Sequence, residues 1–201
     1  MKSDSRNRKK KKTVIRITPD WKWISMTFGL TIGISAAMSF ISSEVLSAGG
    51  LLLSFVVLLA IVLIGILFDI IGMSVTAAAE KPFHSMAAKK VPEATVAIRL
   101  IRRAERVSSI CNDVVGDICG VISGSASAVI AARVVVNMEP TVSSILQLMM
   151  SALVAAVTVG GKAFGKSIAM NNATVIIHTA AKIIYFFKSI PQNVSRLFRR
   201  K

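Results

Sequence analysis

Residues 50–68 restrict the fold of this chain more than any other feature of the sequence. They read GLLLSFVVLLAIVLIGILF and contain no charged residue. At about 1.5 Å per residue, a helix of this length covers the ~30 Å of hydrocarbon in a bilayer. The composition agrees, because 53% of the residues are apolar and the mean hydropathy is +0.65. The sequence therefore predicts an integral membrane protein.

Three further apolar stretches have spanning length. Together the four stretches cover residues 21–41, 51–79, 107–136 and 142–164. The third is the least apolar, because it carries Asp113 and Asp117 among several Gly and Ser residues. Trp21 and Trp23 at the start of the first stretch suit an interfacial aromatic belt. We predict an all-α integral membrane protein with four transmembrane helices and amphipathic juxtamembrane helices.

The basic residues lie beside the apolar stretches. The chain has 25 Lys and Arg against 10 Asp and Glu, a formal net charge of +15. Such a charge also suits nucleic acid, but no aromatic stacking platform lies between the basic residues. Juxtamembrane Lys and Arg are attracted to anionic inner-leaflet lipids by ~1 kcal/mol each. We therefore expect membrane lipids and no nucleic acid as partners, with these headgroup contacts: Lys89, Lys90, Arg99, Arg102, Arg103 and Arg106.

Charge also predicts the topology. A cleavable signal peptide is the alternative for residues 1–45, but the long charged tail and the spanning length of the apolar run favour an uncleaved anchor. The loop 80–106 has seven basic and three acidic residues. The positive-inside rule then places both termini and this loop in the cytoplasm of a multi-pass cell-membrane protein.

This topology divides the chain into four parts. They are a basic cytoplasmic tail (1–20), an extra N-terminal transmembrane helix (21–43), a transmembrane domain (44–171) containing the loop 80–106, and a basic amphipathic C-terminal segment (172–201). In the last segment we expect Pro191 to break the helix.

Residues 160–167 read GGKAFGKS, which formally matches a phosphate-binding P-loop. A P-loop follows a buried strand, whereas the residues before this motif form an apolar run of helix and spanning length. The histidines, His84 and His178, are isolated, and no nucleophile stands beside a base. We therefore predict that the match is accidental and that the protein is not an enzyme.

The same region carries a family resemblance. GKAFGKSIAMNNATVI, residues 161–176, resembles the end of the last membrane helix in the cyclin M (CNNM) and CorB/CorC magnesium transporter family. SVTAAAEKPF, residues 74–83, and RRAERVSSICNDVVGDI, residues 102–118, resemble two earlier segments of that family in the same order. The resemblance covers residues 55–185. The chain departs from the family pattern with Lys162 at the family's glutamate, and its 201 residues contain no CBS module.

The resemblance implies a three-helix transmembrane domain with a juxtamembrane belt, usually a homodimer, in which Ser, Asn and Glu oxygens hold Mg²⁺ between helices. Ser74 falls in the family's S-E-T-A segment, and Asn112 and Asp113 fall on its paired asparagines. The function that it implies is transport or binding of a divalent cation, Mg²⁺ or Co²⁺. The alternative is a non-transporting scaffold or regulator that kept the fold and lost the ion site.

Intramembrane charges are the strongest functional candidates from the residues themselves, because such charges cost several kcal/mol unless paired or hydrated. Asp113 and Asp117 are four apart and so share a helix face. Carboxylate and other hard oxygens are what Mg²⁺ requires. Two interpretations stay open: an ion site, or a salt bridge from Lys162 to Asp113 or Asp117. Asp69 is expected to reach headgroup water. The candidate metal ligands are Ser74, Asn112, Asp113 and Asp117.

Small residues in the third span predict close helix packing. Gly116, Gly120 and Gly124 recur every four residues, which lets another backbone approach closely. The pattern leaves open whether that backbone belongs to the same chain or to a second copy in a homodimer.

Overall fold

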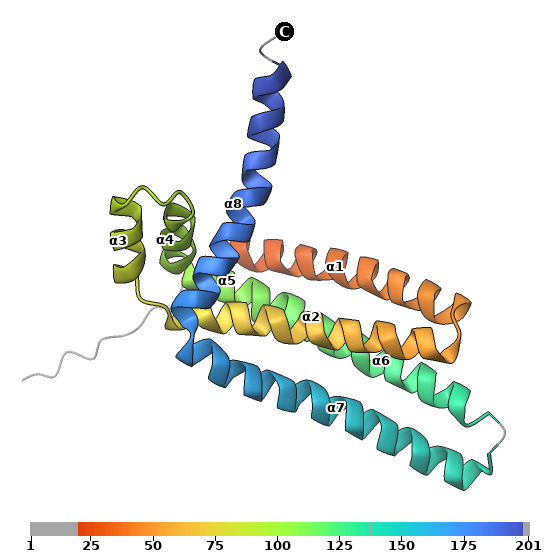
Figure 1. The fold of residues 1–201 in the computed structure, drawn as a ribbon. Helices are drawn as coiled ribbons and strands as arrows, with labels where there is room; N and C mark the ends of the chain where they lie inside the picture. The colour runs from red at the N-terminus through yellow and green to blue at the C-terminus, as the bar shows by residue number, and fades with distance from the viewer. Residues whose placement is uncertain (1–19, 137, 199–201) are drawn as a thin grey trace, which may run out of the picture.

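Four long helical segments run side by side in the computed structural model, which describes residues 20–136 and 138–198 (Figure 1). Each is long and apolar enough to cross a membrane. The predicted all-α class with four transmembrane helices is confirmed, and most of the predicted basic tail lies outside the described residues. The segments are α1 (Trp21–Ala48), α2 (Leu51–Ala77), the series α5 (Ala104–Ser109), η1 (Ile110–Gly116) and α6 (Asp117–Val134), and α7 (Pro140–Asn171).

The most apolar span, α2, is the central helix of the bundle. It packs against α1, α6, α7 and η1. Leu58 and Val62 of α2 are buried against Ala126 and Ile130 of α6. Side chains on the outside of the bundle are apolar as well, for example Leu52, which is 80% exposed. Lipid tails are as apolar as leucine, so this outer surface is suited to a bilayer.

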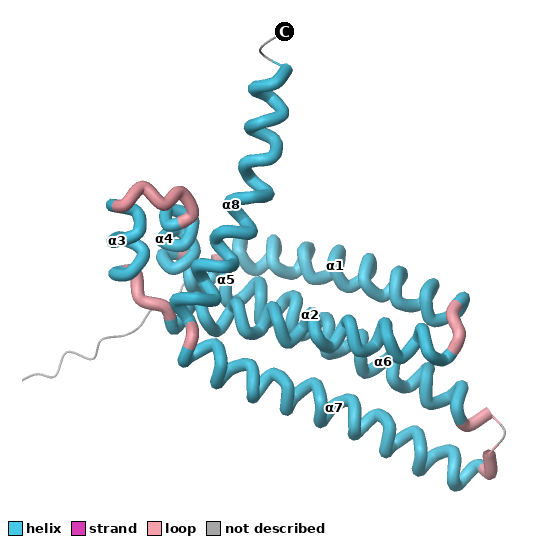
Figure 2. Tube along the Cα trace, in the orientation of Figure 1, coloured by secondary structure: helices cyan, strands magenta, loops and turns pink. Residues whose placement is uncertain are grey.

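A small helical layer covers one end of the bundle, and Figure 2 shows that short loops connect its helices. The layer consists of α3 (Lys81–Ala88), α4 (Ala94–Arg102) and the first part of α8 (Ala173–Phe198). Its core joins buried Val75 of α2, Phe83 of α3, Ala97 of α4 and Ile177 of α8. We call this end of the molecule the basic end, because the six predicted headgroup residues lie there, all of them exposed.

The fourth apolar stretch, residues 142–164, lies within α7, which ends at Asn171. One expectation about α8 is wrong. The expected break at Pro191 is absent, because α8 remains a helix from Ala173 to Phe198. A proline inside a helix removes one i→i−4 hydrogen bond, and the rest of the ladder can continue around it.

Candidate functional site

Three charged side chains from three different spans meet at one level of the bundle, where Lys162 and Asp69 are 22% and 20% exposed and Asp117, at 73%, lies on the outer surface. Lys162 Nζ on α7 lies 3.8 Å from Asp69 Oδ1 on α2 and 3.7 Å from Asp117 Oδ1 on α6. The same ammonium donates a hydrogen bond to the carbonyl oxygen of Gly116 at 3.2 Å. We call these three side chains the charge cluster. One cation thus lies between two carboxylates, and the pairing reduces the cost of placing charge within the spans.

The cluster differs from the sequence expectation at Asp69. That side chain is 20% exposed and faces Lys162, instead of reaching out to headgroup water. Asp69 lies eight residues before the end of α2 at Ala77, which is roughly 12 Å along the helix. Lys162 lies nine residues before the end of α7 at Asn171. The two side chains are therefore at nearly the same distance from the basic end.

Glycines bring the three helices close enough for the cluster to form. A Cβ at Gly116 would lie 2.9 Å from Asp69 Oδ1 and 3.4 Å from Lys162 Nζ. On α7, a Cβ at Gly165 would lie 2.7 Å from Ile70 Cγ1, and one at Gly161 would overlap a side chain of α2. These two glycines belong to the P-loop-like motif. In this fold they serve the packing of α7 on α2.

The third span contains a π-helix, η1, at the residues where the resemblance places paired asparagines. Asn112 Nδ2 donates a hydrogen bond to Ser108 Oγ at 3.1 Å. Asn112 Oδ1 is buried without a hydrogen-bond partner among the described residues and lies against Gly72. An unsatisfied buried amide oxygen costs free energy, and π-helical turns are frequent at functional sites. Both features make η1 a candidate functional element.

Asp113, also on η1, lines a cavity of about 740 Å³ at the basic end. This cavity lies between the start of α1, the end of α2 and α5. Three carboxylates and three hydroxyls contribute to its wall, which makes it suited to a hydrated cation. The lining residues are Asp20, Trp23, Thr76, Glu105, Arg106, Ser108, Ser109 and Asp113.

A second hollow begins at the charge cluster. It is a groove of about 440 Å³ between α6 and α7, with Asp117 and Lys162 among its lining residues. Four hydroxyl side chains continue it: Ser123, Ser127, Ser151 and Thr158. Asp113 and Asp117, which the sequence places on one helix face, line different hollows. The wider turn of the π-helix between them changes their relative angle.

Ser74 is fully buried on α2 and holds α2 to α7. Its Oγ donates a hydrogen bond to Ile70 O at 2.7 Å and lies 3.5 Å from Ala169 O. In the described part of the chain, no hydrogen bond joins Ser74 to Asn112, Asp113 or Asp117. Of the four predicted ligands, the structure places Asn112 and Asp113 on η1, Asp117 in the charge cluster and Ser74 at a separate helix contact.

The donor set at the cluster limits which metal chemistry it can support. Within residues 20–136 and 138–198, no three His, Cys, Asp or Glu side chains converge into a metal-binding group. A cation at the cluster would be held by Asp69, Asp117, the carbonyl oxygen of Gly116 and water. This donor set suits Mg²⁺, which binds through one or two carboxylates and keeps several waters.

Arg106 connects the third span to the first. Its guanidinium lies 5.1 Å from the centre of the Trp23 ring, and its Nη2 lies 3.8 Å from Asp20 Oδ2. A cation over an indole face is attracted by the ring quadrupole. The contact closes one side of the 740 Å³ cavity, because all three residues line it.

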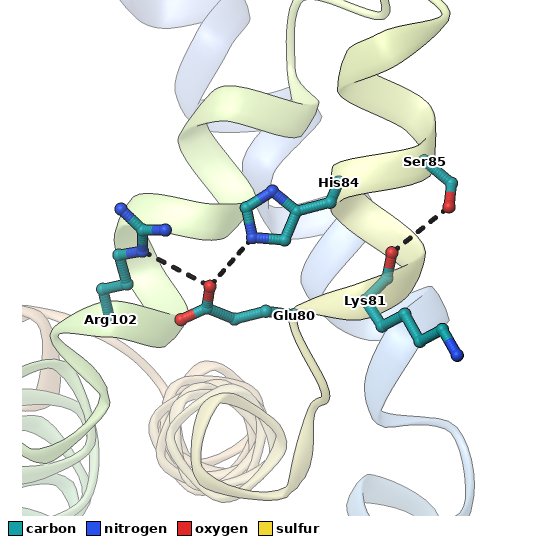
Figure 3. Close-up of polar contacts among 5 residues, drawn as sticks. All are labelled: Glu80, Lys81, His84, Ser85 and Arg102. Atoms are coloured by element: carbon teal, nitrogen blue, oxygen red, sulfur yellow. Dashed lines mark hydrogen bonds and ion pairs between the residues drawn. The ribbon is translucent and has the colours of Figure 1, made fainter.

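Glu80 forms a polar cluster at the basic end, between His84 and Arg102 (Figure 3). Its Oε2 accepts hydrogen bonds from His84 Nε2 at 3.0 Å and from Arg102 Nε at 3.3 Å. The hydrogen bond from His84, followed by that from Arg102, lowers the pKa of Glu80 below its usual 4.5. A depressed folded-state pKa contributes stability above pH 4.5, and that stability is lost as the pH falls through the folded-state pKa.

We therefore expect the Glu80 carboxyl carbon to titrate by NMR with a midpoint below 4.5. The His84→Ala variant should move that midpoint back toward 4.5, because it removes the largest cause of the shift. A Glu80 midpoint at or above 4.5 would contradict the prediction.

Comparisons of the chain with protein-family models, curated proteins and solved structures found no match. The class that the fold defines is a multi-pass membrane protein of four spans. The resemblance to the CNNM and CorB/CorC family stays a prediction that depends on the segments quoted above.

Proposed function

We propose that this protein binds a divalent cation and transports it across the cell membrane, with Mg²⁺ as the first candidate and Co²⁺ as the second. The observation that carries the proposal is the charge cluster and its position. Two carboxylates surround one ammonium, at the start of a hydroxyl-lined groove and one helical turn from an acidic cavity.

Lys162 occupies the position that a cation would take. Its distances of 3.7 and 3.8 Å to the carboxylates are those of ion pairs without a close hydrogen bond, so Lys162 can be displaced. When the ammonium moves into the groove, Asp69 and Asp117 are left with two negative charges. A divalent cation matches this charge. Lys162 is then a tethered competitor whose single positive charge offsets one of the two carboxylate charges between transport events.

The predicted ligands have distinct roles in this proposal. Asp113 receives the hydrated ion in the cavity, Asn112 Oδ1 offers an unused acceptor on η1, and Asp117 binds the ion in the cluster. Asp69 joins this set on the basis of its contact with Lys162. Ser74 retains acceptor lone pairs, because its hydroxyl hydrogen is donated to Ile70 O.

The orientation follows from the exposed charges. Six Lys and Arg side chains at the basic end are exposed, and the sequence adds the basic tail before residue 20. The positive-inside rule favours a cytoplasmic basic end, with both termini inside. The 740 Å³ cavity then opens toward the cytoplasm. Anionic lipids of the inner leaflet are the expected partners of the six side chains.

A non-transporting scaffold or regulator is the second candidate. The observation that favours it is the hydrogen bond from Lys162 to Gly116 O, because a fixed ammonium would permanently offset one of the two carboxylate charges. This candidate needs no ion and no enzymatic chemistry. A homodimer is compatible with both candidates, since a Cβ at Gly120 or Gly124 would meet no described atom within 4 Å.

Thermal stability in Mg²⁺ separates the two candidates. A ligand that binds only the folded state stabilises it by about 2.7 kcal/mol at a hundredfold excess over its Kd. We expect MgCl₂ to raise the melting temperature of the detergent-purified protein, and KCl of equal ionic strength to leave it unchanged. Asp117→Asn should abolish the response, because Asp117 binds the ion in the cluster, whereas Asp113→Asn should only weaken it. Glu139→Gln, which removes an exposed carboxylate elsewhere, should retain it. No response up to roughly tens of millimolar Mg²⁺ would favour the scaffold.

A further inference from the structure

The two halves of α8 have different environments. In the first half, Ala173, Ile177 and Ala181 are buried against α2 and the helical layer of the basic end. Their spacing of four residues fixes one face of the helix on the bundle. Beyond Ala181, as far as side chains are described, every residue from 182 to 188 is exposed. Among the described side chains of α8, the ones that the bundle buries therefore end at Ala181.

The second half carries an apolar stripe bordered by lysines. Ile183, Phe186 and Phe187 are spaced three and four residues apart and share a face, and they are 53%, 62% and 67% exposed. The two phenylalanine rings pack edge to face, 6.1 Å apart. Lys182 lies four residues before Phe186, and Lys188 lies four residues after Ile184. Each lysine therefore borders the apolar stripe on one side.

We propose that residues 182–189 of α8 lie in the headgroup layer of an anionic membrane, with the apolar stripe toward the acyl chains and the two lysines on lipid phosphates. This interaction surface is independent of the proposed cation transport. It requires only that the four spans cross the bilayer.

Position and charge favour lipid as the occupant. A single residue, Asn172, separates α7 from α8, so α8 starts where a span leaves the membrane. In Figure 1, α8 runs across the direction of the spans, and its second half extends away from them beyond α1. In a bilayer that region is lipid, so the stripe is continuous with the apolar surface of the bundle. The sequence after the stripe adds Arg196, Arg199, Arg200 and Lys201, which complement anionic headgroups.

A depth measurement on the full-length protein in vesicles tests the proposal. The environment-sensitive fluorophore NBD is attached to Phe187→Cys, and as a matched control to Ser189→Cys. These positions are two residues apart and so point to nearly opposite sides of the helix. The unsubstituted protein gives the labelling blank, because Cys111 and Cys119 are 8% and 2% exposed. The vesicles contain phosphatidylcholine alone or with phosphatidylglycerol.

We expect the probe at position 187 to emit further to the blue than the probe at 189 and to be quenched by nitroxide-labelled lipid. Phosphatidylglycerol should enlarge this difference, and the Lys182→Gln/Lys188→Gln variant should lose the enlargement while keeping the difference in phosphatidylcholine. Water-like emission from both probes would overturn the proposal. A second outcome would also overturn it: blue-shifted emission at position 187 that appears only at a high protein-to-lipid ratio and is not quenched by nitroxide-labelled lipid. The stripe would then contact a second copy of the protein.

Discussion

Replacing Lys162 by glutamine is expected to destabilise the protein by roughly 1–3 kcal/mol, between the values for an exposed and a buried ion pair, because Lys162 and Asp69 are 22% and 20% exposed. The loss arises because the Asp69 carboxyl, at 20% exposure, loses the ammonium that pairs with it. The measurement is thermal unfolding of the detergent-purified variant in the absence of divalent ions. Lys166→Gln is the matched control, since Lys166 is an exposed lysine of the same helix and its loss should cost within ~0.5 kcal/mol.

The double variant Asp69→Asn/Lys162→Gln identifies the cause. Removing both charges removes the penalty of an unpaired carboxylate, so the double variant should be more stable than Lys162→Gln alone.

Mg²⁺ then tests the proposed function in the single variant. A transporter with a vacated cation position should gain more stability from Mg²⁺ in Lys162→Gln than in the native protein, whereas a scaffold should gain none. Unchanged stability together with unchanged Mg²⁺ response in Lys162→Gln would refute both roles for Lys162.

The substitution Gly65→Ala is expected to cost roughly 1–3 kcal/mol, as is typical of overpacking a tight contact. A Cβ at Gly65 would lie 2.8 Å from the Cys119 Cβ, well inside the optimal carbon separation of about 3.5–4.0 Å. Both atoms are attached directly to backbones, so α2 and α6 must move apart to accommodate the methyl group. Thermal unfolding of the purified variant measures the loss.

The same substitution at Gly120 supplies the control. Gly120 is on α6, and a Cβ there would meet no described atom within 4 Å. Alanine is the better helix former by up to ~1 kcal/mol, so Gly120→Ala should leave the stability unchanged or raise it. Equal losses at Gly65 and Gly120 would show that helix composition, rather than the α2–α6 contact, determines the effect.

Much of the architecture could be predicted from the sequence, because a bilayer imposes simple rules on length and polarity. The apolar run 50–68 is the core of α2, and the weak third stretch does form a span. For the helical layer at the basic end, the sequence predicts only that amphipathic juxtamembrane helices are present. A local turn between Ala88 and Ala94, where Lys90 has a φ of 62°, separates α3 from α4.

The candidate site was less predictable, because it depends on how helices from distant parts of the chain align. Asp69 and Lys162 are separated by nearly half of the sequence, and α7 offers two lysines, Lys162 and Lys166, as partners for the one carboxylate of α2. A signal for their pairing did exist: they have opposite charges and lie eight and nine residues from the ends of their helices. The π-helix could not be predicted, because an i→i+5 turn has no simple sequence rule.

The distances of the charge cluster from the two ends of α2 have an electrical consequence. The charge-free part of α2, from Leu51 to Phe68, is about 27 Å long, close to the full hydrocarbon thickness. The cluster therefore marks the inner limit of the insulating layer, and most of the membrane voltage falls between the cluster and the far ends of the spans. The electrostatic free energy of a divalent ion that moves from the cluster along that path would change by about 4.6 kcal/mol for every 100 mV of membrane potential. The proposed cation transport would therefore respond strongly to voltage.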